Sequence, residues 1–137
     1  MADLRAFAPT DEGANLEVKD PGGELLKLEG KQVTIKLASH DSSKWKKSEQ
    51  AAFNRRVKAA QARQGRVSIT AAESENDRIS NVVAVTLGWE NVIVGGEVLA
   101  CNPENATAVY REFPFIFEQA ENFATNRENF LKGSAAA

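Results

Sequence analysis

Large apolar side chains recur every three or four residues near the C-terminus, and this spacing constrains the fold more than any other feature of the sequence. The stripe consists of Phe113, Ile116, Phe117, Ala120, Phe123, Ala124 and Phe130. Because glutamates and an asparagine occupy the opposite side, the spacing predicts an amphipathic helix with an aromatic face. Such a face has to be covered, so we expect the rest of the chain to supply elements that pack against it.

The N-terminal part alternates apolar and polar residues, as β-strands with one solvent-facing side do. The alternating apolar residues are Leu16, Val18, Leu26, Leu28, Val33, Ile35 and Leu37. The Asp-Pro-Gly-Gly cluster at 20–23 supplies a fixed φ and then a residue free to adopt positive φ, which favours a tight turn. Residues 13–38 are therefore predicted to form a small antiparallel β-hairpin region, after a flexible lead-in over residues 1–12.

A long basic helix is predicted over residues 42–65, because the segment lacks proline and glycine until Gly65 and is rich in helix-favouring residues. Its apolar sector consists of Trp45, Ala52, Phe53, Val57 and Ala60. Its basic sector contains Lys44, Lys47, Arg55 and Lys58. Residues 44–66 hold eight basic side chains and one acidic side chain, a local excess that the net charge of -2 conceals.

The basic sector has two interpretations. Clustered lysines and arginines are what phosphate contact requires, so a nucleic-acid interface is one of them. The other is a solvated helix face, or a face that pairs with acidic side chains of this chain or of a partner. We favour the second interpretation, because no aromatic residues are interleaved along the basic side and no DNA-reading motif is present.

A core helix is predicted over residues 70–88. Thr70 and Glu73 have the spacing of a capping box, in which hydroxyl and carboxylate satisfy early backbone N–H groups. The first half of the segment is polar and acidic, and residues 79–87 are apolar almost all round. We expect this second half to lie at the centre of the core, and Gly88 to close the helix.

The C-terminal third is predicted to contain a short β-turn insertion near 92–99 and a helical hairpin over 103–131. Gly95 and Gly96 lie between β-branched runs, and Asn102 followed by proline and glutamate is a strong helix start. Phe113-Pro114 divides the helical hairpin. The fold class is therefore α+β, a single domain over 13–132 in which about four helices follow the β-region, with a disordered tail at 133–137.

Composition argues against several classes of function. Cys101 and His40 are each the single residue of their type, which disfavours zinc sites and nucleophilic triads. No paired carboxylates suggest acid–base chemistry, so we expect no enzyme activity, no cofactor and no metal. The longest apolar run is far too short to cross a bilayer, and the start lacks a secretory pattern, so a cytoplasmic protein is expected.

The aromatic helix also has two interpretations, a core-facing stripe and a partly exposed partner surface. A domain of this size has limited capacity to cover phenylalanines on more than one side of a helix. The candidate partner-binding residues are Phe113, Phe115, Phe117, Phe123 and Phe130, together with Lys44, Lys47, Arg55 and Lys58.

The order of motifs in the C-terminal half resembles a known family. The matching motifs are Gly88-Trp89, Gly96 with Leu99, Pro103-Glu104-Asn105-Ala106, Tyr110, Phe113-Pro114-Phe115-Ile116 and Asn129-Phe130. This order is similar to that of the small tail assembly chaperones of long-tailed bacteriophages. The N-terminal half is similar as well, with an alternating hairpin, an Asp-Pro-x-Gly turn and Asp41-Ser42 opening a helix, so the resemblance covers most of residues 14–131.

This resemblance implies a non-enzymatic protein of the host cytoplasm that is absent from the mature virion. Family members bind the tape measure protein and help to recruit tail tube subunits, and a longer product is often made by ribosomal frameshifting. Residues 90–132 hold seven acidic and three basic side chains, opposite in balance to the basic helix, so self-association is also possible. The alternatives are a structural tail or neck component of the virion and a small nucleic-acid-binding regulator that uses residues 44–66.

Overall fold

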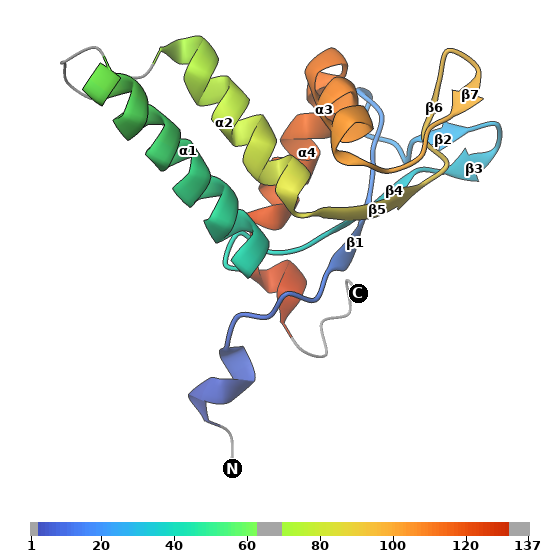
Figure 1. The fold of residues 1–137 in the computed structure, drawn as a ribbon. Coiled ribbons are helices and arrows are strands. Elements are labelled where there is room, and N and C mark those ends of the chain that lie inside the picture. The colour runs from blue at the N-terminus through green and yellow to red at the C-terminus, as the bar shows by residue number, and fades with distance from the viewer. Residues whose placement is uncertain (1–2, 63–69, 132–137) are drawn as a thin grey trace.

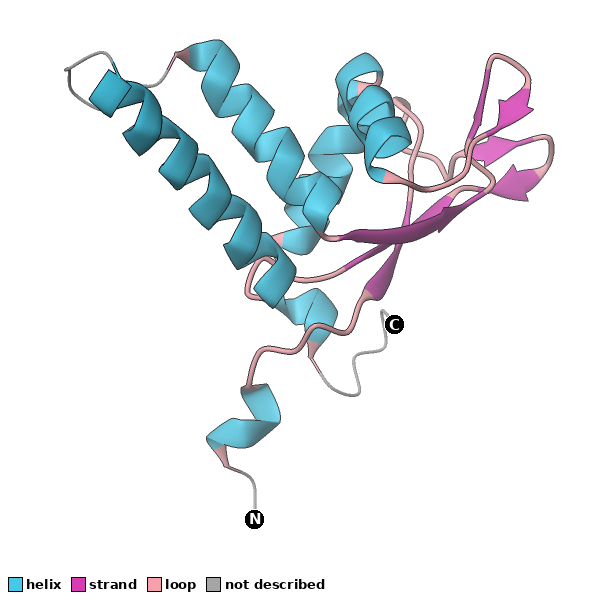
Figure 2. Ribbon diagram, viewed as in Figure 1, coloured by secondary structure: helices cyan, strands magenta, loops and turns pink. Residues whose placement is uncertain are grey.

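The computed structural model describes residues 3–62 and 70–131, which form an α+β fold as predicted (Figures 1 and 2). The helices are α1 (Ser43–Ala62), α2 (Ala71–Ala84), α3 (Pro103–Glu112) and α4 (Pro114–Ala124), with 3-10 turns η1 (Leu4–Phe7) and η2 (Arg127–Phe130). The strands are β1 (Ala14–Glu17), β2 (Lys27–Leu28), β3 (Lys31–Gln32), β4 (Thr34–Leu37), β5 (Thr86–Glu90), β6 (Ile93–Val94) and β7 (Glu97–Val98).

The central sheet is antiparallel and has the strand order β1-β4-β5. Ile35 of the middle strand pairs with Leu16 on one side and with Trp89 on the other. The side chains of Ile35 and Leu37 point into the core, whereas Lys36 between them is exposed, as the period-two pattern predicts. The β2–β3 and β6–β7 hairpins extend from this sheet on one side of the molecule (Figure 1).

The predicted helix over 70–88 is too long, because α2 ends at Ala84 and the next residues form strand β5. Thr70 caps α2 as expected, and its hydroxyl accepts a hydrogen bond from the Glu73 backbone N–H at 3.1 Å. At the other end, the hydroxyl of Thr86 lies 2.7 Å from both the Val82 carbonyl and the Tyr110 hydroxyl. Pairing with β4 overrides the local helical pattern here.

The aromatic segment also ends earlier than predicted, because α4 stops at Ala124 rather than at residue 131. The hydroxyl of Thr125 donates to the Glu121 carbonyl at 2.9 Å, and the side chain of Asn126 accepts from the Glu128 backbone N–H at 3.1 Å. The chain therefore turns and continues as η2. This turn places the Phe130 ring 5.6 Å from the Phe123 ring, in an edge-to-face arrangement.

The core lies where α2, α3 and α4 meet the inner face of the sheet. Its largest fully buried side chain is Tyr110 of α3, which is 1% exposed, and Val82 of α2 and Leu37 of β4 are fully buried beside it. Burial of Val82 and Val85 confirms that residues 79–85 are central, but Leu87 is 37% exposed on β5.

Helix α1 packs against α2 on the other side of the molecule (Figure 1). Trp45, Ala52 and Ala60 are buried there, as predicted. Phe53, which the helical wheel placed on the packing side, is 53% exposed, because α1 packs mainly against α2 and that contact leaves Phe53 outside it. The predicted end of this helix at Gly65 and the predicted tail at 133–137 lie outside the described residues. Among the described helices, none is long and apolar enough to cross a membrane.

Candidate functional site: an apolar pocket between the hairpins and the C-terminal helices

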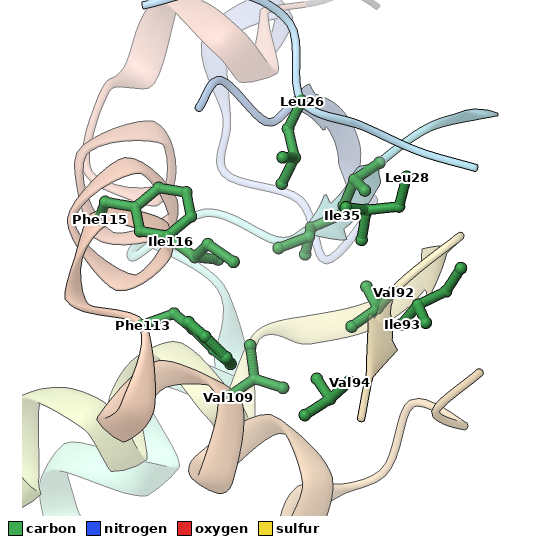
Figure 3. Close-up of a pocket in the computed structure, with 11 residues that line it drawn as sticks. Leu26, Leu28, Ile35, Val92, Ile93, Val94, Val109, Phe113, Phe115 and Ile116 are labelled. Carbon is green, nitrogen blue, oxygen red and sulfur yellow. The ribbon is translucent and has the colours of Figure 1, made fainter. Parts of the chain in front are cut away.

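An open apolar pocket of about 160 Å³ lies between the two hairpins and the start of α4 (Figure 3). It is lined by Leu26, Leu28, Val33, Ile35, Val92, Ile93, Val94, Val109, Phe113, Phe115 and Ile116. These side chains come from three separate parts of the chain and converge on one space. Apolar cavities of about 150 Å³ hold a benzene-sized ring, so this pocket is large enough for one large apolar side chain.

The aromatic wall of the pocket follows from the Phe113-Pro114 break. Phe113 ends α3 and caps α4 with φ -122, and Pro114 occupies the first turn of α4, where its missing N–H costs nothing. The rings of Phe113 and Phe115 lie 6.5 Å apart at an interplanar angle of 80°. The break therefore places two aromatic side chains at the pocket, next to Ile116 and to Val109 of α3.

The hairpin wall depends on a two-residue turn. Gly95 and Gly96 have φ values of 61 and 84, the backbone that a type I′ turn requires and that glycine adopts without strain. Strand β6 then presents Ile93 and Val94 to the pocket. The amide nitrogen of Asn91 donates to the Gln32 carbonyl at 2.8 Å, which ties the β6–β7 hairpin to the β2–β3 hairpin.

The lining determines what the pocket can do chemically. Its side chains are all aliphatic or aromatic, and none of those described carries an ionisable group. Acid–base chemistry, nucleophilic attack and charge recognition all need such groups, so the pocket can bind apolar surface but offers no catalytic group. Cys101, which is not part of the pocket lining, is half-buried, and burial raises the pKa of its thiol, which disfavours the reactive thiolate.

The five phenylalanines of the predicted partner surface lie in three different environments. Phe113 and Phe115 are half-buried and line the pocket. Phe117, also named as a candidate partner residue, is 7% exposed, so its ring belongs to the core. Its ring lies 5.9 Å from that of Tyr110, and the Arg78 guanidinium sits 5.5 Å from its centre.

Phe123 and Phe130 are half-buried and pack against each other, apart from the pocket. Phe130 contributes with Phe7 and Leu131 to a second hollow of about 230 Å³. This hollow is partly polar, because Arg127 and Asp41 also line it. The two side chains form an ion pair in which Arg127 Nε lies 2.7 Å from Asp41 Oδ2.

Helix α1, which carries the basic residues, lies on the opposite side of the molecule from the two hairpins (Figure 1), and it contributes no residue to the pocket lining. Lys44, Lys47, Arg55 and Lys58 are all exposed. Arg55 lies 3.6 Å from the Asp77 carboxylate of α2, and Arg56 donates a hydrogen bond to the same carboxylate. Part of the local positive charge is therefore matched by an acidic side chain of the same protein.

The hairpin side of the pocket was not predicted as a functional site. Leu28, Ile93 and Val94 belong to short apolar runs beside glycine turns, and these runs indicated strands rather than a binding surface. No protein-family model, curated protein or solved structure matches this chain. In the described part of the chain, no three His, Cys, Asp or Glu side chains are grouped so that they could hold a metal ion.

Proposed function

We propose that this chain is a tail assembly chaperone of a long-tailed bacteriophage, which binds the tape measure protein and helps to recruit tail tube subunits. The observation that carries this proposal is the wholly apolar pocket, because Phe113 and Phe115 of its wall belong to the motif order that resembles this family. An open pocket of this kind suits a protein that holds the apolar side chains of another polypeptide.

The tape measure protein of such phages is long and largely helical, so its apolar stripes are prone to aggregate before the tail tube covers them. One large side chain of such a stripe would fill the pocket, and the half-buried rings of Phe113 and Phe115 would extend the contact along the partner helix. The protein would act in the host cytoplasm and be absent from the mature virion. No catalytic step is part of this role.

Co-expression with the tape measure protein of the same phage tests the proposal. We expect the wild-type chain to raise the soluble yield of that partner and to be recovered with it. The double variant Leu28→Ser and Phe115→Ser should reduce both, because it removes apolar surface from opposite walls of the pocket. Val98→Ser is the matched control, since Val98 is 74% exposed on β7 and does not belong to the pocket lining.

Two outcomes would count against the proposal. An unchanged partner yield with the wild-type chain removes the chaperone role. If the pocket variant and the Val98 control lower the soluble yield of the partner equally, the pocket is not the binding site. Mass spectrometry of purified virions tests the structural alternative, because a tail or neck component would persist in the particle.

A further inference from the structure

The N-terminal segment, residues 3–12, crosses the body of the protein without being buried in it. Every residue in this range is exposed, and the turn η1 within it buries none of its side chains. Even Phe7, which lines the second hollow, is 66% exposed. A terminal segment is held in place only where something ties it down, so the contacts of this segment decide where it lies.

Asp11 supplies the tie, because its carboxylate is bound at the start of α1. It accepts hydrogen bonds from the Ser43 backbone N–H at 2.8 Å and from the Ser43 hydroxyl at 2.9 Å. In the described part of the chain, these are the only hydrogen bonds that join residues 3–12 to the rest. The positive end of the helix dipole also favours a carboxylate at this place. The hydrogen bonds from Ser43, together with the charges of Lys44 and Lys47, hold the pKa of Asp11 below its ordinary value of 3.8.

Between η1 and Asp11, the segment lies across the C-terminal turn η2. Figure 1 shows it passing beside η2 on its way to β1, and a hollow of about 230 Å³ remains between the two. The residues that line this hollow are Phe7, Ala8, Pro9 and Thr10 from the segment, and Ser39, Asp41, Arg127, Phe130 and Leu131 from the body. The segment therefore spans the hollow instead of filling it. Lifting the segment would uncover Phe130 and Leu131 at the cost of little buried apolar area.

A single tie above a loosely covered aromatic side chain allows local opening while the domain stays folded. We propose that residues 3–12 act as a strap, which closes over Phe130 and Leu131 while Asp11 is bound to Ser43 and lifts off as a unit when that contact breaks. Local opening needs little free energy where few apolar contacts and few hydrogen bonds are lost. The Phe130 ring, 5.6 Å from that of Phe123, stays with the body when the strap lifts.

The strap controls access to a residue that the sequence indicated as part of a partner surface. Phe130 is one of the five candidate phenylalanines, but it lies apart from the pocket that carries the proposed function. The open state is the one in which its ring can contact another polypeptide. The inference does not depend on the proposed function, because the strap and the surface that it covers belong to the same chain.

Hydroxyl-radical footprinting of the full chain tests the strap, because the oxidation rate of each side chain, measured by mass spectrometry, follows its contact with water. Asp11→Ala should raise the oxidation rates of Phe130 and Leu131 severalfold, although Asp11 itself does not line the hollow. Asp3→Ala is the matched control. It removes a carboxylate of the same segment that caps η1 through the Arg5 backbone N–H, and it should leave both rates unchanged.

A second variant removes the apolar contact of the strap and leaves the start of α1 intact. Phe7→Ala should also raise the oxidation rate of Phe130, because the Phe7 side chain lines the hollow from the opposite side. Leu4→Ala is its control. Leu4 is 87% exposed on the same turn and does not line the hollow, so its loss should leave the Phe130 rate unchanged.

Phe117 reports whether a variant is folded. Its side chain is 7% exposed, so its oxidation should stay slow in every variant that keeps the domain intact. If Phe117 becomes reactive in Asp11→Ala, loss of the helix cap has unfolded the chain. Ser43→Ala, which removes one of the two hydrogen bonds to Asp11 and keeps the backbone cap, then takes its place.

Two results would overturn the proposal. An unchanged Phe130 rate in either folded strap variant would show that the segment does not cover η2 or that Asp11 does not hold it there. A rise of the same size in the Asp3 or Leu4 control would show that any change in the segment loosens this region, so that the contact between Asp11 and Ser43 has no special role.

Discussion

Helices α1 and α4 were both candidates for a partner surface, and the structure uses them in opposite ways. Helix α1 spans 20 residues and buries three of them, whereas α4 spans 11 residues and buries four. The first contacts mainly α2 and leaves most of its side chains exposed. The second is flanked by helices, sheet and hairpins, so the rings at its start line a hollow instead of projecting into water.

Residue type identifies a candidate surface, but the neighbouring elements decide whether a partner can reach it. Phe115 and Phe117 are two positions apart on the same helix. The first lines the open pocket and the second is sealed against Tyr110. Phe53, on the polar helix, is more exposed than either of them.

Truncating one phenylalanine on each helix gives the largest expected contrast. Phe117→Ala should lower the free energy of unfolding by about 3–5 kcal/mol, because it leaves a cavity among buried side chains. Phe53→Ala should change it by no more than about 0.5 kcal/mol, since Phe53 is 53% exposed. Urea unfolding monitored by circular dichroism measures both. Similar costs for the two variants would contradict the contrast between the helices.

Neutralising Asp77 tests what holds α1 in place. Asp77→Asn removes the carboxylate that faces both Arg55 and Arg56, and we expect a loss of about 1–2 kcal/mol in the free energy of unfolding. The loss should shrink in high salt, because Arg55 is largely exposed. Glu49→Gln, on the exposed side of α1, is the control. An equal effect from this control would show that general charge balance, and not this contact, stabilises the helix pair.

The link between Asp41 and the C-terminal η2 should give a pH-dependent contribution to stability. Hydrogen bonding from Arg127 holds the pKa of Asp41 below its ordinary value of 3.8, against the opposing effect of burial. The contribution is therefore fully present above pH 3.8 and is lost as the pH falls through the lower folded-state pKa. Asp41→Asn should lower the melting temperature at pH 7 by roughly 1–3 °C, since Arg127 is largely exposed.

The same melts repeated in acid check the sign of this effect. The difference between the wild type and Asp41→Asn should disappear once the wild-type carboxyl is protonated. A difference that grows on acidification would show that folding raises the pKa of Asp41 instead of lowering it, and would contradict the assignment.

The smallest effect is expected on the outer face of α1. Replacing Lys44 and Lys47 by alanine should change the free energy of unfolding by less than about 0.5 kcal/mol, because both side chains are exposed. A fluorescence titration with duplex and single-stranded DNA at low salt should detect no binding. Affinity that falls steeply with salt and is weakened in this variant would instead support a nucleic-acid interface.

The sequence was most informative where contacts with distant parts of the chain do not override the local pattern. Period-two alternation predicted the strands before Leu37, and cap chemistry predicted the starts of α2 at Thr70 and of α3 at Asn102. The Phe113-Pro114 break between α3 and α4 follows from proline geometry alone. These features depend on a few neighbouring residues.

The sequence was least informative where distant elements decide the outcome. Residues 86–90 belong to a segment with a helical pattern, but they form β5 because they pair with the edge of β4 that β1 leaves open. The pocket needs Leu28, Val94 and Phe115 to converge from three parts of the chain, and no local pattern encodes such a meeting. The phenylalanines correctly indicated that α4 contributes to the pocket. The hairpins that complete the pocket could be placed only from the three-dimensional structure.

The bond from the Asn91 amide to the Gln32 carbonyl joins the bases of two hairpins that are far apart in the sequence. Neither hairpin can swing outward alone without breaking it. We therefore expect the two hairpins to keep a fixed spacing across the mouth of the pocket.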